Sequence, residues 1–159
     1  MFSNLTAAIL LIGVAAPMPA QNQKQARPRF TLPENVEVAA DIVYAAYGQK
    51  QLRLDLYLPK PRPTRPIPGI VAIRGGGWRQ GDKQGFAPIA AGLAAAGLAA
   101  ACIEYRVLPE VSFPDPVYDV KAAIRWMRAE GPRYGISPGA IGAIGGSAGG
   151  HLVALLGSS

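Results

Sequence analysis

The sequence predicts an α/β fold with a mostly parallel sheet, because strand-like and helix-like segments alternate along most of its length. Three nearly continuous apolar runs are typical of strands covered on both faces: residues 69–74, 98–105 and 140–145. Segments with helical spacing, 86–97 and 115–130, separate them. Because a strand–helix–strand crossover is right-handed, this succession predicts parallel neighbours in one sheet.

Two further strands are predicted ahead of this alternation, at residues 37–46 and 51–59. The second alternates cleanly, with four leucines on one face and polar or aromatic residues on the other. Gly48 lies between the two, so we expect an antiparallel pair at an edge of the sheet. The proline-rich residues 59–68 predict an extended connector to the next strand.

In the first predicted helix, in the segment 86–97, the large apolar residues Phe86, Ile89 and Leu93 lie at helical spacing, and the helix is expected to end at Gly97. In the second, Asp115 is expected to cap the N-terminus, with Pro116 at the first helical position.

One acidic residue inside the second helix has two basic neighbours at short spacing. Asp119 is therefore expected on the helix surface, as a partner for Lys121 or Arg125.

The composition predicts one modest domain that needs no cofactor. The chain has 159 residues, 50% of them hydrophobic, which is enough for a packed core. The net charge is +6, but basic and acidic residues are mixed and no RNA- or DNA-binding motif accompanies them, so no nucleic-acid partner is expected. The single cysteine, Cys102, is predicted to be a core residue. One histidine and one cysteine far apart make a poor metal site, and neither a metal nor an organic cofactor is predicted.

The N-terminal residues predict a secretory signal. Residues 5–16 form an apolar run of about the length of a signal-peptide core, which is too short to span a bilayer. We interpret residues 1–20 as a signal peptide and 21–36 as a flexible spacer, which leaves a mature chain without a membrane span. The predicted location is secreted or periplasmic, and the folded domain is expected at residues 37–159.

Residues 145–149 have the pattern G-x-S-x-G, with Ser147 at its centre. They lie between a predicted strand and a predicted helix, and the four neighbours of the serine are all Gly or Ala. Small neighbours let such a turn close tightly, which holds the serine in a strained conformation with its hydroxyl exposed. Glycine-rich turns before helices also serve nucleotide binding and plain packing, so the context carries more weight than the pentapeptide.

A second glycine segment, Gly75 to Gly77, directly follows the strand at 69–74. Ester hydrolysis passes through a tetrahedral oxyanion, and backbone N–H groups can bind it only where the chain comes close to the substrate, which glycines permit. A phosphate-binding loop is the alternative, but the segment lacks both G-K-[ST] and the G-x-G-x-x-G spacing.

Three segments carry a family resemblance: "GIVAIRGGGWRQGDK", "YRVLPEVSFPDPVYDVKAAIRWMR" and "YGISPGAIGAIGGSAGGHLVALLGSS". In order and spacing they resemble the α/β-hydrolase family, in the hormone-sensitive-lipase-like branch that includes secreted bacterial carboxylesterases and feruloyl- or acetylxylan-esterase-like proteins. The likeness runs from about Val38 to Ser159.

The resemblance implies a three-layer α/β-hydrolase sandwich with an eight-stranded sheet, of which about five strands are present here. It implies that Ser147 is the nucleophile and that the backbone N–H groups of Gly76, Gly77 and Ala148 form the oxyanion hole. The implied activity is cleavage of a small-molecule or carbohydrate-linked carboxylic ester through an acyl-enzyme. The family usually has a histidine before the three glycines, where this chain has Arg74.

The acid and the base of the catalytic triad are not expected within this chain. In this fold they follow the nucleophile, the acid first and the histidine last, but no Asp or Glu follows Ser147. The only histidine, His151, lies in the first turn of the next helix and is expected to be a structural residue packed under the serine turn. We therefore interpret residues 37–159 as the N-terminal part of a hydrolase domain. A peptidase or amide hydrolase of the same fold and a non-catalytic truncated product are the alternatives.

Overall fold

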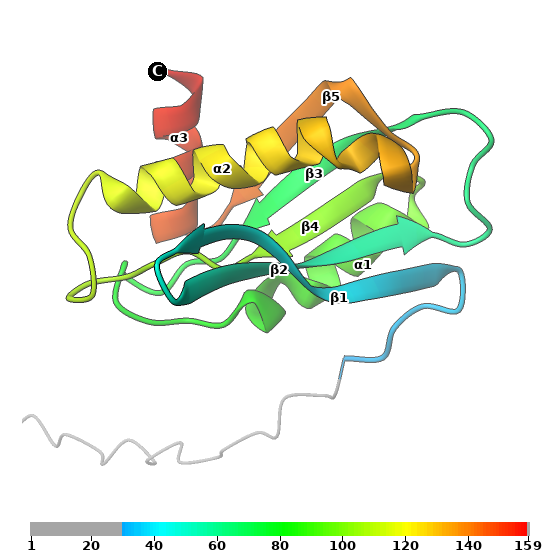
Figure 1. Ribbon diagram of the computed structural model, residues 1–159. Coiled ribbons are helices and arrows are strands. Elements are labelled where there is room, and N and C mark those ends of the chain that lie inside the picture. The colour runs from blue at the N-terminus through cyan, green and yellow to red at the C-terminus, as the bar shows by residue number, and fades with distance from the viewer. Residues whose placement is uncertain (1–29, 159) are drawn as a thin grey trace, which may run out of the picture.

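The computed structural model describes residues 30–158, in which five strands form one sheet with helices on both faces (Figure 1). The strands are β1 (Val36–Tyr47), β2 (Lys50–Pro59), β3 (Ile67–Ile73), β4 (Ala99–Ile103) and β5 (Ile136–Gly145). The helices are α1 (Ala87–Ala95), α2 (Asp115–Ala129) and α3 (Ala148–Gly157), with short 3-10 helices η1 (Lys83–Phe86) and η2 (Gly131–Tyr134).

The sheet has the strand order β1-β2-β4-β3-β5. β1 and β2 form the predicted antiparallel hairpin, with β1 at the edge, and β2 is also antiparallel to β4. β3 lies parallel to both β4 and β5. The predicted α/β class is therefore confirmed, and its parallel part consists of the three strands that alternate with helices.

The N-terminal predictions fall mostly outside the described residues. This holds for the signal peptide at 1–20 and for most of the spacer at 21–36, so both remain predictions. Val36 is buried and already begins β1, one residue before the expected start of the domain. In the part of the chain that the structure describes, no helix combines the length and the apolar character needed to cross a bilayer.

One face of the sheet carries a hydrophobic layer built from long side chains. All four leucines of β2, at alternate positions from Leu52 to Leu58, are buried in it, as the period of two predicts. α2 contributes Val120 and Met127, and α3 contributes Leu152. α2 and α3 therefore cover the same face, and burial of their apolar side chains holds α3 against the sheet.

The opposite face is covered by α1 mainly through small side chains. Of the three large residues at helical spacing, Phe86 and Leu93 are half-buried and pack against this layer, and Ile89 does not. Ile89 is 41% exposed. The buried residues of α1 are all alanines: Ala87, Ala90, Ala91 and Ala94. The strands beneath are also lined by small residues such as Ala72 and Ala100, so helix and sheet pack closely and leave little room for larger side chains.

The single cysteine belongs to this small-residue layer. Cys102 is buried there, as predicted, and burial raises the pKa of its thiol to about 12.

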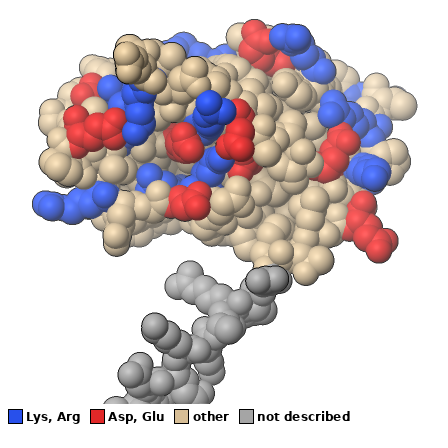
Figure 2. Space-filling view, turned by 60° about the horizontal axis from the view of Figure 1, so that its bottom comes forward, with Lys and Arg blue, Asp and Glu red and all other residues tan. Residues whose placement is uncertain are grey.

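Charged side chains of both signs are mixed on the surface. On the face in Figure 2, Lys and Arg lie beside Asp and Glu, so its positive charge does not form one continuous patch. Exposed pairs join Lys50 to Glu110 at 3.2 Å and Arg133 to Glu130 at 2.9 Å. Exposed pairs of this kind contribute little to stability.

A buried ion pair connects the start of α2 to the chain that follows β4, and it corrects the prediction for Asp119. The Asp119 carboxylate is fully buried and accepts hydrogen bonds from the Arg106 backbone N–H at 2.9 Å and from its guanidinium at 2.7 Å. These bonds raise the pKa of Arg106. The guanidinium also stacks on the Tyr47 ring at 3.7 Å. Asp119 therefore points into the fold, away from the basic residues of its own helix.

The N-terminus of α2 also differs from the prediction. Asp115 is the first helical residue and not the cap, a position that Pro114 occupies without a side-chain hydrogen bond.

We expect Asp119→Ala to lower the free energy of unfolding by roughly 3 kcal/mol, because it leaves the Arg106 charge partly buried without its partner. The measurement is urea denaturation followed by circular dichroism. Asp115→Ala is the matched control, since Asp115 lies 4.0 Å from the same guanidinium and is 40% exposed; it is expected to cost less than about 1 kcal/mol. Equal losses in the two variants would contradict this account of the pair.

Candidate active site

The two glycine segments predicted to carry chemistry meet at one end of the sheet. β3 and β5 are parallel neighbours, and their pairing ends with Ile73 opposite Gly145. The segment after β3 and the turn after β5 therefore begin side by side. The Gly146 N–H donates to the Ile73 carbonyl oxygen at 3.3 Å. A methyl group on Gly75 would lie only 3.3 Å from the Ser147 Cβ.

Ser147 connects β5 to α3 in a backbone conformation that is unusual for a residue with a side chain. Its φ is 51° and its ψ is −119°. Such a conformation is costly and persists only where the surroundings impose it. The residue is exposed, and its hydroxyl does not cap α3. The strand–turn–helix context predicted for this serine is confirmed, and its hydroxyl is not committed to the helix.

Glycines on either side of the serine allow this turn to close. A Cβ on Gly149 would collide with the carbonyl oxygen of Ile73, and a Cβ on Gly145 would collide with the backbone of Gly149. The start of α3 therefore packs directly on the end of β3, at a distance that only glycine allows.

Hydrogen bonds to two carbonyl groups orient the peptide units of the glycine segment. The Gly75 carbonyl oxygen accepts from the Arg74 side chain at 3.1 Å, and the Gly76 carbonyl accepts from the backbone N–H groups of Arg79 and Gln80 at 3.1 and 3.2 Å. In a planar trans peptide the C=O and the next N–H point in opposite directions. The N–H groups of Gly76 and Gly77 therefore point away from these partners.

All three predicted oxyanion donors have unused N–H groups. Within residues 30–158, the backbone N–H groups of Gly76, Gly77 and Ala148 donate to no protein acceptor. Ala148 is the first residue of α3, where the N–H has no partner inside the helix. Three main-chain donors are thus left in the two segments that meet at this end of the sheet.

Arg74, at the position where the resemblance implies a histidine, braces the glycine segment from inside. It is buried, and its Nη1 donates to the carbonyl oxygens of Gly75 and Gln80 at 3.1 and 2.5 Å. Its guanidinium lies 4.4 Å from the centre of the Tyr105 ring, whose hydroxyl donates to the Arg74 carbonyl at 3.1 Å. The Arg74 side chain therefore links Gly75 to Gln80 across the loop that follows β3.

An apolar pocket of about 230 Å³ lies next to this site. Its lining is almost free of polar surface and consists of Trp78, Leu108, Phe113, Pro116, His151 and Leu152. Trp78 directly follows the glycine segment, and its carbonyl accepts the Leu108 N–H at 2.7 Å. The pocket is therefore built from three segments that are distant in sequence.

His151 differs from its prediction in one respect. It lies one helical turn after Ser147, whose carbonyl accepts its N–H at 3.0 Å, but its side chain is exposed and is not packed under the turn. Its ring stands edge-on to Trp78 with 5.4 Å between centroids. The reason is that a tight turn of glycines leaves no space beneath it for an imidazole, which instead joins the pocket wall.

Sequence reasoning did not identify the pocket. Leu108 and Phe113 lie in an irregular segment between β4 and α2, where no periodic pattern indicates which side chains gather. Trp78 carried the one usable signal, an aromatic residue directly after three glycines. As for metals, no group of three or more His, Cys, Asp or Glu in residues 30–158 is arranged to hold an ion.

Comparison with known proteins gives one family and several esterases. The family model BD-FAE matches residues 54–159, about two thirds of the chain. Esterase LipC of Mycobacterium tuberculosis is 42% identical over 114 residues, which are 70% of this chain and 28% of LipC.

Two solved structures extend the likeness to the fold. A bacterial heroin esterase has a TM-score of 0.72 and 30% identity, over 80% of this chain and 40% of its own. Esterase 2 of Thermogutta terrifontis, phosphorylated by paraoxon, has a TM-score of 0.68 and 37% identity, over 78% of this chain and 47% of its own. The chain spans less than a third of LipC and less than half of either solved structure.

We expect Ser147→Gly to raise the free energy of unfolding by about 1 kcal/mol, because glycine adopts this backbone conformation without the cost that a Cβ imposes. Chemical denaturation of the purified chain measures it. Ser112→Gly is the control: this exposed serine lies in an irregular segment and has no positive φ, so the change is expected to be neutral or destabilising. A Ser147→Gly variant no more stable than the original chain would show that the turn holds no strain.

Proposed function

This chain belongs to the BD-FAE family of the α/β-hydrolase fold, and we propose that Ser147 is its nucleophile in the cleavage of carboxylic esters. The observation that carries the proposal is the Ser147 backbone, with φ at 51° between a strand and a helix. A serine held in this way presents its hydroxyl to a substrate at the end of the sheet. The relatives add support, since they are esterases and one of them is phosphorylated by paraoxon.

In the proposed reaction the Ser147 oxygen attacks the ester carbonyl carbon while a general base takes the hydroxyl proton. The tetrahedral intermediate then expels the alkoxide, which takes that proton back from the base and leaves as the alcohol. Water hydrolyses the resulting acyl-enzyme, which releases the carboxylic acid and restores the serine. In this fold the histidine base follows the nucleophile after the acid. His151 does not fit that order, so the proposal assigns the base and the acid to residues outside this sequence.

The oxyanion of that intermediate would be bound by the main-chain N–H groups of Gly76, Gly77 and Ala148. All three are unused within residues 30–158, and they belong to the two segments that meet beside Ser147. Donors fixed by the backbone need no reorganisation when the charge develops, which is what makes such a hole effective.

The substrate would be an ester with an apolar acyl or alcohol group. The pocket lined by Trp78, Phe113 and His151 has a volume of about 230 Å³, and its walls offer hardly any polar surface. Phe113 is 70% exposed at this pocket. Burial of an apolar group against these side chains would supply binding energy and hold the carbonyl beside the serine.

The test is labelling by a fluorophosphonate probe, located by peptide mass spectrometry, in two samples. One is the 159-residue chain. The other is this chain fused to the part of Thermogutta terrifontis esterase 2 beyond the aligned region, which would supply the missing base. We expect Ser147 to be labelled in the fusion and not in the chain alone. In the fusion, Ser147→Ala is expected to lower kcat for p-nitrophenyl butyrate by at least roughly 10⁴-fold.

Ser112→Ala in the fusion is the control and is expected to keep full labelling. A fusion that is folded by circular dichroism but unlabelled at Ser147 would overturn the assignment of the nucleophile. Labelling of the chain alone would show instead that a base within it, such as His151, activates the serine.

A further inference from the structure

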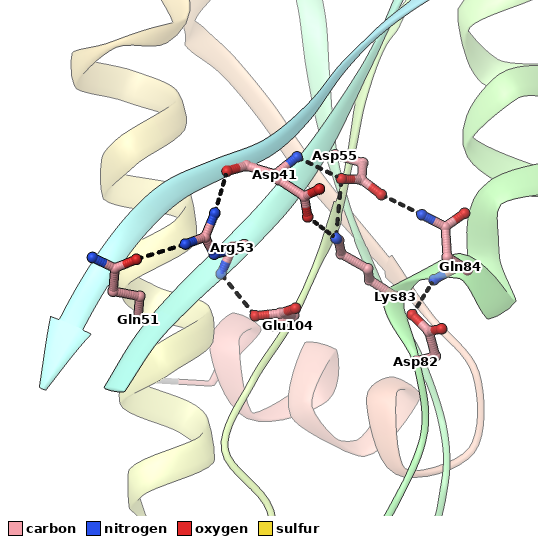
Figure 3. Close-up of polar contacts among 8 residues, drawn as sticks. All are labelled: Asp41, Gln51, Arg53, Asp55, Asp82, Lys83, Gln84 and Glu104. Atoms are coloured by element: carbon pink, nitrogen blue, oxygen red, sulfur yellow. Dashed lines mark hydrogen bonds and ion pairs between the residues drawn. The ribbon is translucent and has the colours of Figure 1, made fainter. Parts of the chain in front are cut away.

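A cluster of ionic and polar side chains surrounds Lys83 on the small-residue face of the sheet; Lys83 and Asp55 are buried in it, and Asp41 and Gln84 are exposed (Figure 3). The cluster consists of Asp41 on β1, Asp55 on β2, and Lys83 and Gln84 on η1. Lys83 is 8% exposed and Asp55 is 1% exposed. The Lys83 Nζ lies 2.6 Å from the Asp41 carboxylate and 3.1 Å from that of Asp55.

Each oxygen of the Asp55 carboxylate has a partner. Its Oδ1 accepts the Asp41 backbone N–H at 2.8 Å in addition to the Lys83 ammonium, and its Oδ2 accepts from the Gln84 side chain at 2.6 Å. Asp41 lies at an irregularity in the pairing of β1 with β2 and has a φ of 56°. That local distortion directs its N–H towards Asp55. The strand irregularity and the ion cluster thus form one unit.

The cluster keeps Lys83 charged although the residue is buried. Burial by itself lowers the pKa of Lys83, but the hydrogen bonds to Asp41 and Asp55 outweigh this effect and raise it. The same contact lowers the pKa of Asp41. The ion pair of Lys83 with Asp41 therefore persists across the neutral pH range, and it holds η1 to β1.

The Lys83–Asp55 pair is buried, and a buried ion pair of this kind adds little net stability compared with apolar side chains of similar size. On this face of the sheet most of the buried apolar residues are alanines, with Cys102, Val36 and Tyr57 beside them. Small side chains bury little area and specify position weakly. Directional contacts from Lys83 and Gln84 supply the specificity that the small side chains lack.

η1 connects the cluster with both parts of the candidate active site. Lys83 is its first residue, and the loop of residues 74–82, which carries Gly76 and Gly77, leads directly into it. Phe86 is its last residue, and its ring contacts the serine turn: a Cβ on Gly146 would lie 3.1 Å from the Phe86 Cζ. A displacement of η1 would therefore move the glycine segment and the support of the turn together.

From these contacts we infer that Lys83, clamped between Asp41 and Asp55, is a positioning residue that sets the glycine segment of Gly76 and Gly77 against Ser147. The inference rests on the proposed function, in which this segment binds the oxyanion. Lys83 acts through η1 and touches neither the serine nor the substrate. A small misplacement of a reacting group lowers the rate strongly. A residue that fixes the position of the glycine segment can therefore affect turnover without touching the substrate.

The test compares variants by two measurements: ¹⁵N order parameters of the Gly76 and Gly77 amides in the 159-residue chain, and the rate of Ser147 phosphonylation in the fusion described above. We expect Lys83→Met to lower these order parameters from about 0.85 to below about 0.6 and the rate at least roughly tenfold. Lys83→Arg, which keeps the charge, should restore most of both. Lys50→Met removes an exposed lysine from an ion pair and should change neither.

Two further variants cover loss of folding, since Lys83→Met leaves Asp55 buried without its ion partner. Lys83→Met combined with Asp55→Asn removes both buried charges and keeps an acceptor for the Asp41 N–H. Asp41→Asn removes an exposed carboxylate and tolerates a positive φ. Both should change the two measurements in the same direction as Lys83→Met.

The inference would be overturned if the Lys83→Met/Asp55→Asn and Asp41→Asn variants fold but keep the unmutated chain's order parameters at Gly76 and Gly77 and the unmutated fusion's phosphonylation rate. The proposed function fails separately: if Ser147 in the original fusion is not labelled while the order parameters still fall, the positioning of the glycine segment by Lys83 stands and the assignment of the nucleophile does not.

Discussion

The parallel pairing of β3 with β5 is the constraint on which the candidate site depends. It ends with Ile73 opposite Gly145, so the two segments that follow start at the same edge of the sheet. A shift of this register would separate the serine from the glycine segment whatever their own conformations. The close packing of Gly149 on the Ile73 carbonyl strengthens the constraint, because α3 can start at only one height relative to β3.

The helices on the two faces of the sheet are held in place by different kinds of contact. On the α2 and α3 face, long side chains interlock, and α3 is held by the same layer that contains the leucines of β2. On the α1 face, alanines allow close approach but restrict sliding weakly. The ion cluster of Lys83 lies at the end of that face where η1 meets the candidate active site. There the position of the glycine segment relative to Ser147 matters for the proposed function.

The parts of this molecule that could be predicted from sequence are those set by local pattern. The leucines of β2 predict a strand by their period of two, and the glycines around Ser147 predict a tight turn between a strand and a helix. Local pattern failed where tertiary contacts decide the outcome. Asp119 pairs with Arg106 and not with a basic residue of its own helix, and Ile89 is exposed although it fits the helical spacing. The pocket depends on the path of the irregular segment that carries Leu108 and Phe113, and such a segment has no periodic signal.

Arg74 stands where the resemblance implies a histidine, and its side chain holds carbonyl groups of the chain around the glycine segment. The proposed oxyanion donors are main-chain groups, so the side chain before the glycines matters only through the carbonyl groups that it holds. Because a peptide N–H points opposite to the carbonyl of the same unit, a donor on the Gly75 carbonyl turns the Gly76 N–H the other way. Arg74 supplies that donor and binds the Gln80 carbonyl as well.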